Sequence, residues 1–180
     1  MKIIFDSEAE LEAFIHDKWN EEGICCIDDS SPEFLERQLN LNEYGICDLV
    51  AFTFYQYEDV RSVDVVVYEL KKEKITADAF SQVSRYATGI EQAFKQKDSS
   101  LSVSITCVLV GTEIDDSCYI LNQSEFMYYK PFFNPESGVD FKELGSGWHR
   151  KNDVPVRISD FVDNCFVKNE TVSEVPKDEH

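Results

Sequence analysis

The sequence predicts an α/β protein of the mixed α+β kind, built around a central mixed sheet that helices flank. Two segments, 7–22 and 76–97, carry apolar residues at helical spacing. Three segments with the alternation or the β-branched and aromatic residues typical of strands lie between them, and a fourth follows the second helix. The expected order of elements is therefore helix, three strands, helix, strand, or αβββαβ.

The first predicted helix, 7–22, has signals at both ends. Ser7 followed by Glu10 is a capping-box pattern, and Gly23 ends the helical period. One face carries the apolar residues Leu11, Phe14, Ile15 and Trp19. After this helix, "ICCI" at 24–27 is expected to form a short strand and "DDSSP" a loop.

Three strands follow, and the third of them is expected to be central. Segments 33–41 and 46–57 can pair as a hairpin around the turn Asn42–Gly45. The dense valine content of "SVDVVVYELK", at 62–71, is typical of a strand that is buried on both faces.

The second predicted helix, 76–97, begins with Thr76 as the expected N-cap. It connects the strand at 62–71 to the apolar segment "LSVSITCVLVGT" at 101–112. A helical crossover of this kind favours parallel pairing of the two strands that it joins. Since the earlier strands form an antiparallel meander, the sheet is expected to be mixed.

Beyond residue 112 the patterns are shorter. "SCYIL" at 117–121 and "FMYYKPFF" at 126–133 are expected to be peripheral strands, and "RISDFVDNCFV" at 157–167 a short helix. No shift in composition separates two domains, so residues 1–167 are predicted to form a single domain. The polar and acidic residues 168–180 are expected to form a flexible tail.

The formal charge of −18 argues against a surface that binds nucleic acid without specificity. The charge is unevenly distributed, because residues 61–97 carry seven Lys and Arg against five Asp and Glu. That segment has a charge of +2 and the rest of the chain −20. Within it, Lys72, Lys74 and Arg85 are the candidates for contacts with nucleic acid.

The six cysteines form no CxxC pair and mostly have apolar neighbours, which is typical of reduced, buried thiols. We therefore expect a cytoplasmic protein. A thiol switch at Cys25 and Cys26 and a zinc site are the alternatives. The acidic start is unlike a signal peptide, and no segment reaches the ~20 apolar residues of a membrane helix, so no membrane partner is expected.

The central predicted strand ends in charged residues, which are costly in a buried strand unless they are paired or bind a metal. Side chains alternate faces along a strand, so Glu69 and Lys71 point the same way while Leu70 faces the core. Asp48, on the neighbouring strand, is expected to lie across from Glu69. Two carboxylates at one sheet edge favour a hard divalent cation, so Asp48 and Glu69 are the predicted ligands of Mg²⁺ or Mn²⁺.

Lys71 completes a group of side chains suited to cleaving phosphodiesters. A lysine beside a metal can orient or help deprotonate an attacking water and can offset the charge that builds up on a phosphate. Gln82 and Tyr86 lie one turn apart on the helix that follows, so both face the same side. Because that helix starts just after Lys71, Gln82 is a candidate for positioning the water or a phosphate.

The order of these residues resembles the PD-(D/E)XK nuclease superfamily. "GICDLVAF" and "VVVYELKKEKITADAFSQVSRY" are similar to the catalytic domain of NucS-type endonucleases, over roughly residues 7–112. The resemblance implies a restriction-endonuclease-like core. It also implies a metal bound by Asp48 and Glu69, a lysine that assists the attacking water, Lys71, and support from Gln82 and Tyr86.

The sequence departs from this family in two places. The hairpin between Asp48 and Glu69 is longer than usual, and Cys47 stands where a proline often precedes the aspartate. Neither change removes a catalytic group. Family members also often have a glutamate on the first helix that aids metal binding, and either Glu12 or Glu8 can fill this position.

Two classes of function follow from these residues. The favoured hypothesis is a metal-dependent DNA endonuclease or DNA-processing nuclease, with RNA as an alternative substrate, acting as a homodimer or within a protein complex. The alternative is a catalytically silent nuclease fold that serves as a binding module or as a DNA mimic. Taken singly, Glu69 and Lys71 could be a surface ion pair and Asp48 a solvated carboxylate. The three together favour the enzyme.

Overall fold

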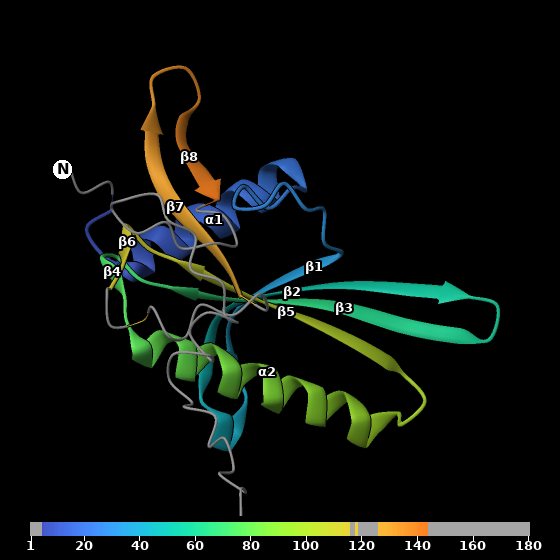
Figure 1. The fold of residues 1–180 in the computed structure, drawn as a ribbon. Coiled ribbons are helices and arrows are strands. Elements are labelled where there is room, and N and C mark those ends of the chain that lie inside the picture. The colour runs from blue at the N-terminus through green and yellow to red at the C-terminus, as the bar shows by residue number, and fades with distance from the viewer. Residues whose placement is uncertain (1–4, 116–117, 119–125, 144–180) are drawn as a thin grey trace, which may run out of the picture. The chain divides into compact units, whose positions relative to one another are not determined.

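The computed structural model describes residues 5–115, 118 and 126–143, all within one compact unit, Met1–Gly147 (Figure 1). Several predictions concern residues outside the described ones: the strand at 117–121 apart from Cys118, the helix at 157–167, the tail at 168–180 and the domain boundary after residue 167.

A six-stranded sheet forms the centre of this unit, with the strand order β1-β2-β3-β5-β7-β8. Its strands are β1 (Phe34–Asn40), β2 (Ile46–Tyr57), β3 (Val60–Leu70), β5 (Ser102–Val110), β7 (Phe126–Asn134) and β8 (Gly138–Glu143). The pairs β1–β2, β2–β3 and β7–β8 are antiparallel, whereas β3–β5 and β5–β7 are parallel. The predicted α/β architecture with a mixed central sheet is confirmed.

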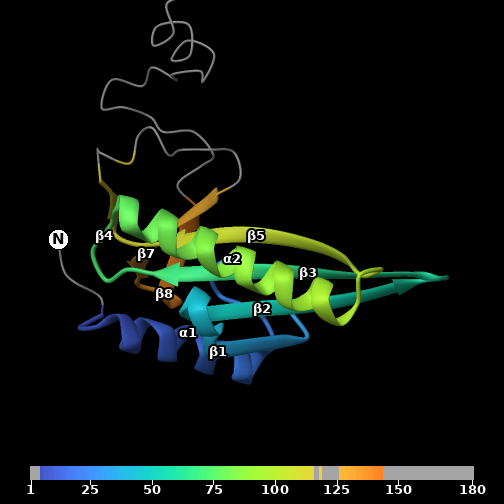
Figure 2. The ribbon, with the colours of Figure 1, turned by 90° about the horizontal axis from the view of Figure 1, so that it is seen from below.

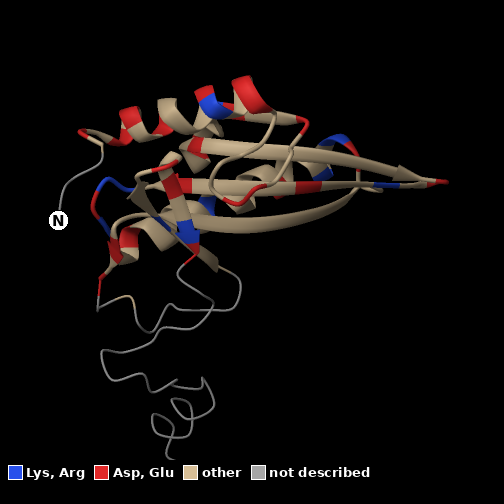
Figure 3. Ribbon diagram, turned by 90° about the horizontal axis from the view of Figure 1, so that it is seen from above, with Lys and Arg blue, Asp and Glu red and all other residues tan. Residues whose placement is uncertain are grey.

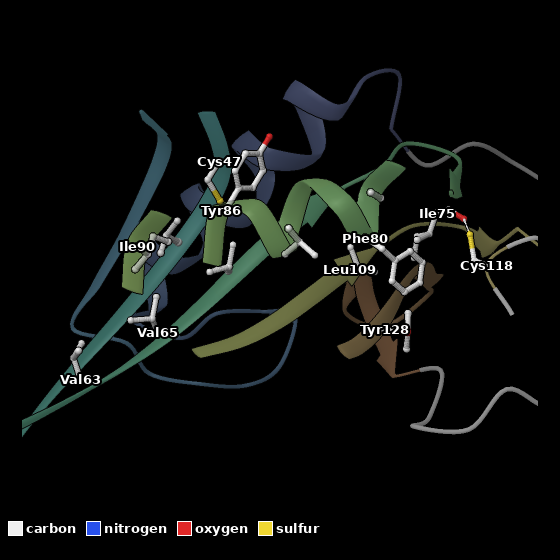
Figure 4. Close-up of a cluster of buried hydrophobic side chains, with 14 residues drawn as sticks. Cys47, Val63, Val65, Ile75, Phe80, Tyr86, Ile90, Leu109, Cys118 and Tyr128 are labelled. Atoms are coloured by element: carbon white, nitrogen blue, oxygen red, sulfur yellow. Dashed lines mark hydrogen bonds between the residues drawn. The ribbon is translucent and has the colours of Figure 1, made fainter. Parts of the chain in front are cut away.

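Two helices, α1 (Glu8–Glu22) and α2 (Ala77–Lys97), pack on opposite faces of the sheet (Figure 2). Successive residues of β2 and β3 point to opposite faces, so each strand contributes to both cores. The core beside α1 contains Leu49, Tyr68 and Leu70. The core beside α2, drawn in Figure 4, contains Val50, Val65 and Val67. As predicted, β3 is buried on both faces.

The helix ends follow the sequence signals. The Ser7 side chain accepts a hydrogen bond from the Glu10 N–H at 3.1 Å, as the capping-box pattern predicts. Gly23 has a left-handed φ of 71°, and its N–H donates to the Trp19 carbonyl at 2.7 Å. Thr76 occupies the N-cap position of α2, but its side chain makes no capping hydrogen bond.

Residues 24–27 form a turn, so the predicted short strand there is wrong. The Cys25 N–H donates to the Ser30 carbonyl at 2.7 Å, and the Asp29 N–H donates to the Cys25 carbonyl at 2.9 Å. The Asp28 carboxylate accepts from the N–H of Ser30 at 3.1 Å and from its hydroxyl at 2.6 Å. These local bonds of Asp and Ser outweigh the short apolar run.

The strand predicted at 126–133 exists as β7, but it is not peripheral. It pairs with β5 on one side and with β8 on the other. The edge strand is β8, which is absent from the sequence prediction because its six residues give only a short alternation. Gly138 begins β8 with φ at 90°, a conformation that suits glycine in the hairpin turn.

Shorter elements hold the connections near the ends of the long strands. They are the 3-10 turn η1 (Asn42–Tyr44) and the strands β4 (Lys74–Ile75) and β6 (Glu113–Ile114). β4 and β6 pair in parallel as a separate two-stranded sheet. Since the Lys71 N–H also donates to the Val110 carbonyl at 2.8 Å, the connection from β3 to α2 is tied to the end of β5.

Two of the cysteines near α1 are poor candidates for a thiol switch. Burial raises the pKa of Cys25 to about 11 and that of Cys26 to about 12. Both are therefore thiols at neutral pH, and a thiol reacts far more slowly than a thiolate.

In the part of the chain that the structure describes, there is no helix with the length and apolar character needed to cross a membrane.

Candidate active site

The site predicted from the sequence lies where β2 begins and β3 ends. These strands are antiparallel, and their last pair at this end joins Leu49 to Tyr68. Continued by one residue, the same register places Asp48 opposite Glu69. Residues directly opposite each other project from the same face of a sheet, so the structure brings the two predicted ligands together.

Glu69 is a buried carboxylate, with only 2% of its surface exposed. Its Oε1 lies 2.6 Å from the ammonium of Lys71. Its Oε2 is buried and has no hydrogen-bond partner among the described residues. A buried oxygen without a partner is costly, so its presence in a folded protein calls for a specific reason, such as a ligand.

Asp48 is fixed through one of its two oxygens. The N–H of Leu70 donates to Oδ2 at 2.9 Å, which ties the carboxylate to the end of β3. Burial raises the pKa of Asp48, although the Leu70 N–H and the charge of Lys71 act in the opposite direction.

The charges of the site leave it short of positive charge. Burial, followed by the charge of Asp48, raises the pKa of Glu69 to about 7. Burial alone would lower the pKa of Lys71, but the hydrogen bond to Glu69 and its negative charge outweigh burial and raise that pKa. Among the described residues, the Asp48 and Glu69 carboxylates face the single ammonium of Lys71, so the site favours the uptake of a further proton or of a cation.

Tyr86 lies on α2 with its ring buried in the core, and the charges of Glu69 and Asp48 act on its hydroxyl. It is 5% exposed, and its ring lies beside Cys47, the residue before Asp48 (Figure 4). Burial and then the charge of Glu69 raise the pKa of Tyr86. Gln82, one turn earlier, is half-buried, and its side chain makes no hydrogen bond to any residue that the structure describes.

Tyr44 anchors the start of β2 to α2. Its ring lies against Gly89, where an added Cβ would come within 2.7 Å of the Tyr44 ring. The Tyr44 hydroxyl donates to Oε1 of Gln92 at 2.7 Å, and the Arg85 Nε donates to the Tyr44 carbonyl at 2.9 Å. These contacts hold the chain just before Asp48.

Glu12 and Glu8, the two candidates on the first helix, have different surroundings. Glu12 is only 4% exposed, and its Oε1 accepts from the Arg37 Nε at 2.7 Å. Its Oε2 accepts from the side-chain amide of Gln38. Glu8 is exposed, and its Oε1 accepts from the N–H of Lys72 at 3.4 Å. Both oxygens of Glu12 are thus used by β1.

Of the residues predicted to contact nucleic acid, Arg85 lies on α2, whereas Lys72 and Lys74 lie between the end of β3 and the start of α2, where the Lys72 N–H also reaches Glu8 of α1. Lys72 belongs to the connection between β3 and α2, and Lys74 pairs with Glu113 at 3.2 Å. The guanidinium of Arg85 lies 5.6 Å from the centre of the Tyr86 ring. Figure 3 shows Asp and Glu along α1 and Lys in the connection between β3 and α2. The α2 side is therefore the better approach for a polyanion.

The two carboxylates fit a small, hard cation. Oε2 of Glu69, which has no partner in the described part of the chain, is an oxygen ligand of the kind that Mg²⁺ prefers. Mg²⁺ is commonly held by one or two carboxylates, with water and phosphate as the other ligands. The described residues contain no group of three or more His, Cys, Asp or Glu that could hold a metal. Carboxylate oxygens such as those of Asp48 and Glu69 are ligands that Mg²⁺ and Mn²⁺ prefer, whereas zinc sites usually add His or Cys.

Three residues around the site are absent from the sequence prediction: Arg37, Gln38 and Tyr44. One signal was present, since Glu12 falls between Leu11 and Ile15 on the apolar face of α1 and a buried charge needs a partner. The partners lie 25 and 26 residues away, on a strand whose register the sequence does not determine.

No protein-family profile matches this chain, and no curated protein matches it in sequence. A similar solved structure is the crystal structure of a repair endonuclease from Pyrococcus abyssi, with 23% sequence identity and a TM-score of 0.45. The alignment covers 72% of this chain and 49% of that protein, so the chain spans about half the length of the protein that it matches.

Proposed function

We propose that the protein is a metal-dependent phosphodiesterase that cuts DNA internally, an endonuclease. The proposal rests on the buried Oε2 of Glu69, which has no partner among the described residues although Asp48 and Lys71 flank the same carboxylate. A buried charge cluster of this kind is weak as a source of stability, so a functional reason is favoured. The resemblance to PD-(D/E)XK nucleases, in the order of these three residues, supports the same reaction.

Each of the three residues has a separate role in this proposal. Asp48 and Glu69 would hold a divalent cation, and Oε2 of Glu69 has no partner among the described residues. When bound, Mg²⁺ or Mn²⁺ would supply a Lewis acid and lower the pKa of a bound water. Lys71, held against Oε1 of Glu69, places a positive charge where negative charge builds up on the phosphate in the transition state.

The helix α2 contributes support and a candidate polar contact. Tyr86 packs beside Cys47 and so supports the strand that carries Asp48. Gln82 lies one turn nearer to the start of the helix, and its amide is available to bind a water or a phosphate oxygen.

DNA is the proposed substrate, and it approaches over the connection between β3 and α2. Lys72 lies in this connection, whereas α1 on the opposite face of the sheet carries mainly acidic residues. Positive charge along one approach is what an acidic protein needs to bind a polyanion there.

The experiment is cleavage of single-stranded, duplex and branched DNA by the full chain in Mg²⁺ or Mn²⁺, with RNA of the same sequences alongside. We expect metal-dependent cutting that falls by roughly 100-fold or more in Asp48→Asn, Glu69→Gln and Lys71→Ala. Glu73→Gln is the matched control, because it removes an exposed carboxylate from the adjacent connection. Cutting of RNA but not of DNA would reassign the substrate.

Two results would contradict the proposal. One is a wild-type chain that binds DNA or a protein partner but cuts neither nucleic acid, which would support the catalytically silent alternative. The other is full activity in Glu69→Gln, which would place the chemistry elsewhere in the molecule.

A further inference from the structure

Two consecutive side chains of β1 bind the same buried carboxylate. The Arg37 Nε donates to Oε1 of Glu12 at 2.7 Å, and the Gln38 amide donates to Oε2. In a regular strand, neighbouring side chains point to opposite faces of the sheet. The strand must therefore be distorted for both residues to reach α1.

The distortion is located at Gln38. Its φ is 49°, a left-handed conformation that is strained and rare for residues other than glycine, asparagine and aspartate. The ladder pairs Arg37 with Leu49 and Leu39 with Cys47, so the register is the same on both sides and no residue is inserted. β1 thus keeps its register but is kinked at one residue.

The kink lies directly beside the candidate active site. In the register of β1 and β2, the position opposite Gln38 is Asp48, and this pair is missing from the ladder. The hydrogen bonds to Glu12 act on the strand neighbour of Asp48. Backbone strain of this kind persists only where the surrounding structure enforces it, and it is concentrated at functional sites.

The bonding of Glu12 also argues against a direct role as a metal ligand. Both of its oxygens accept hydrogen bonds from β1, and only 4% of the residue is exposed. Each of these bonds occupies one lone pair of a Glu12 oxygen, and the Arg37 guanidinium already offsets the charge of the carboxylate, whereas Oε2 of Glu69 has no partner among the described residues.

We propose that Arg37 and Gln38 are positioning residues that act through Glu12. The three residues, here called the β1 clamp, hold β1 kinked and so fix the backbone of β2 at Asp48. This inference rests on the proposed endonuclease function, because it assigns the clamp to the placement of a metal ligand. Residues that orient metal ligands typically change metal affinity or activity by 10- to 100-fold, roughly, when they are replaced.

The kink is tested by changing the backbone preference at position 38 in the full chain. Gln38→Val introduces a β-branched residue that disfavours a left-handed φ, whereas Gln38→Gly removes the same amide but tolerates the φ. We expect kcat for Mn²⁺-dependent DNA cleavage, or Mn²⁺ affinity by calorimetry, to fall roughly 10- to 100-fold in Gln38→Val. Gln38→Gly also lacks the bond to Glu12 but keeps the backbone φ, so it should recover part of that loss, whereas a side-chain contact with the substrate would be lost equally in both variants.

Glu58 provides a matched control for backbone strain. It lies in the turn between β2 and β3 with φ at 52°, nearly the same as that of Gln38. Glu58→Val should therefore lower the free energy of unfolding through the same backbone strain, without the added loss of the Gln38 bond to Glu12, and should leave kcat and Mn²⁺ affinity unchanged. An equal loss of activity in both valine variants would overturn the proposal, because the effect would then be one of stability alone.

Variants of the Arg37–Glu12 ion pair distinguish a positioning role of Glu12 from direct metal binding by Glu12. If the clamp positions Asp48, then Glu12→Gln, Arg37→Met and the double variant should lose activity to a similar extent, since each opens the same clamp. If Glu12 binds the metal, Glu12→Gln should weaken Mn²⁺ binding while Arg37→Met should not, and the proposal is overturned. A wild-type chain that neither binds Mn²⁺ nor cuts DNA is a different result, which overturns the proposed function itself.

Discussion

Lys71 and Glu69 form an ion pair at the end of β3, with Nζ 2.6 Å from Oε1. The other oxygen of Glu69 is buried without a partner among the described residues, and Asp48 stands opposite on β2. Among these described residues, the Lys71 ammonium is thus the one positive charge set against two buried or half-buried carboxylates. The imbalance makes the site respond to pH and to the loss of Lys71, and both responses can be measured without a substrate.

The stability of the metal-free protein should depend on the ionisation of Glu69. Its pKa is raised from 4.5 to about 7 in the folded chain. Between these values the folded chain holds a proton that the unfolded chain has lost, so the contribution to the free energy of unfolding is present below the lower value and is lost as the pH rises through about 7. Glutamine does not ionise, so Glu69→Gln should not show this loss of stability as the pH rises.

Urea unfolding of wild type and Glu69→Gln, in a chelator, tests this sign. The free energy of unfolding of Glu69→Gln relative to wild type should increase from about pH 5 to about pH 8. Glu91→Gln, which removes an exposed carboxylate from α2, is the matched control. A difference between Glu69→Gln and wild type that stays constant with pH would contradict the burial of this charge.

Removing the ammonium should cost more at this site than at the surface. Lys71→Met leaves the Glu69 carboxylate without its hydrogen-bond donor, and we expect a loss of about 1–3 kcal/mol in the free energy of unfolding at pH 8. Lys95→Met breaks an exposed pair with Glu91 and should change the same quantity by less than about 1 kcal/mol. Equal effects in urea unfolding would mean that the Lys71 pair is as solvated as the surface pair.

The contact between Tyr44 and Gly89 should hold the start of β2 against α2. A Cβ at Gly89 would come within 2.7 Å of the Tyr44 ring, so Gly89→Ala should destabilise the protein by about 1–3 kcal/mol.

The double variant Tyr44→Ala/Gly89→Ala shows whether the loss of stability in Gly89→Ala comes from the clash with the Tyr44 ring. With Tyr44→Ala in place, Gly89→Ala should become neutral or stabilising, since alanine is the better helix former by about 1 kcal/mol. Thermal or urea unfolding of the four proteins completes the cycle. Additive changes would show that the ring and the glycine do not act together.

Lys72 should contribute a phosphate contact that depends on salt. Lys72→Ala should weaken DNA binding to a similar extent for all sequences and reduce the slope of log K against log salt by about one. Fluorescence anisotropy in Ca²⁺ measures this without cleavage. Lys95→Ala is the control, because position 95 lies roughly 27 Å from the start of α2 along the helix axis. An unchanged slope in Lys72→Ala would remove this residue from the DNA path.

The order of the main helices and strands, and the strand positions of Asp48, Glu69 and Lys71, could be predicted because local sequence patterns determine them. The valines of β3 mark a strand buried on both faces, and the alternation of a strand places Glu69 and Lys71 on one face. The meander then places Asp48 on the neighbouring strand. Predicting these positions requires only the two-residue alternation of a strand and the pairing of neighbouring strands in a hairpin.

Features that depend on distant contacts could not be predicted in the same way. Gln38 has a left-handed backbone and its amide bonds Glu12 on a different element, and the sequence around this glutamine gives no sign of either feature. The inner position of β7 depends on pairing with β8, and the six residues of β8 alternate over too short a stretch to predict a strand. At 24–27 the apolar run suggested a strand, but the side chain of Asp28 decided the local structure.

Calorimetric titration of the full chain with Mn²⁺ is the most direct test of the proposed metal site, because it needs no choice of DNA substrate. Wild type should bind Mn²⁺, and Asp48→Asn and Glu69→Gln should lose most of this affinity, whereas Glu73→Gln should retain it. Binding should also strengthen as the pH rises through about 7, since the metal competes with the proton on Glu69. No binding to wild type, or equal binding to Glu69→Gln, would contradict the assignment of Asp48 and Glu69 as a metal site.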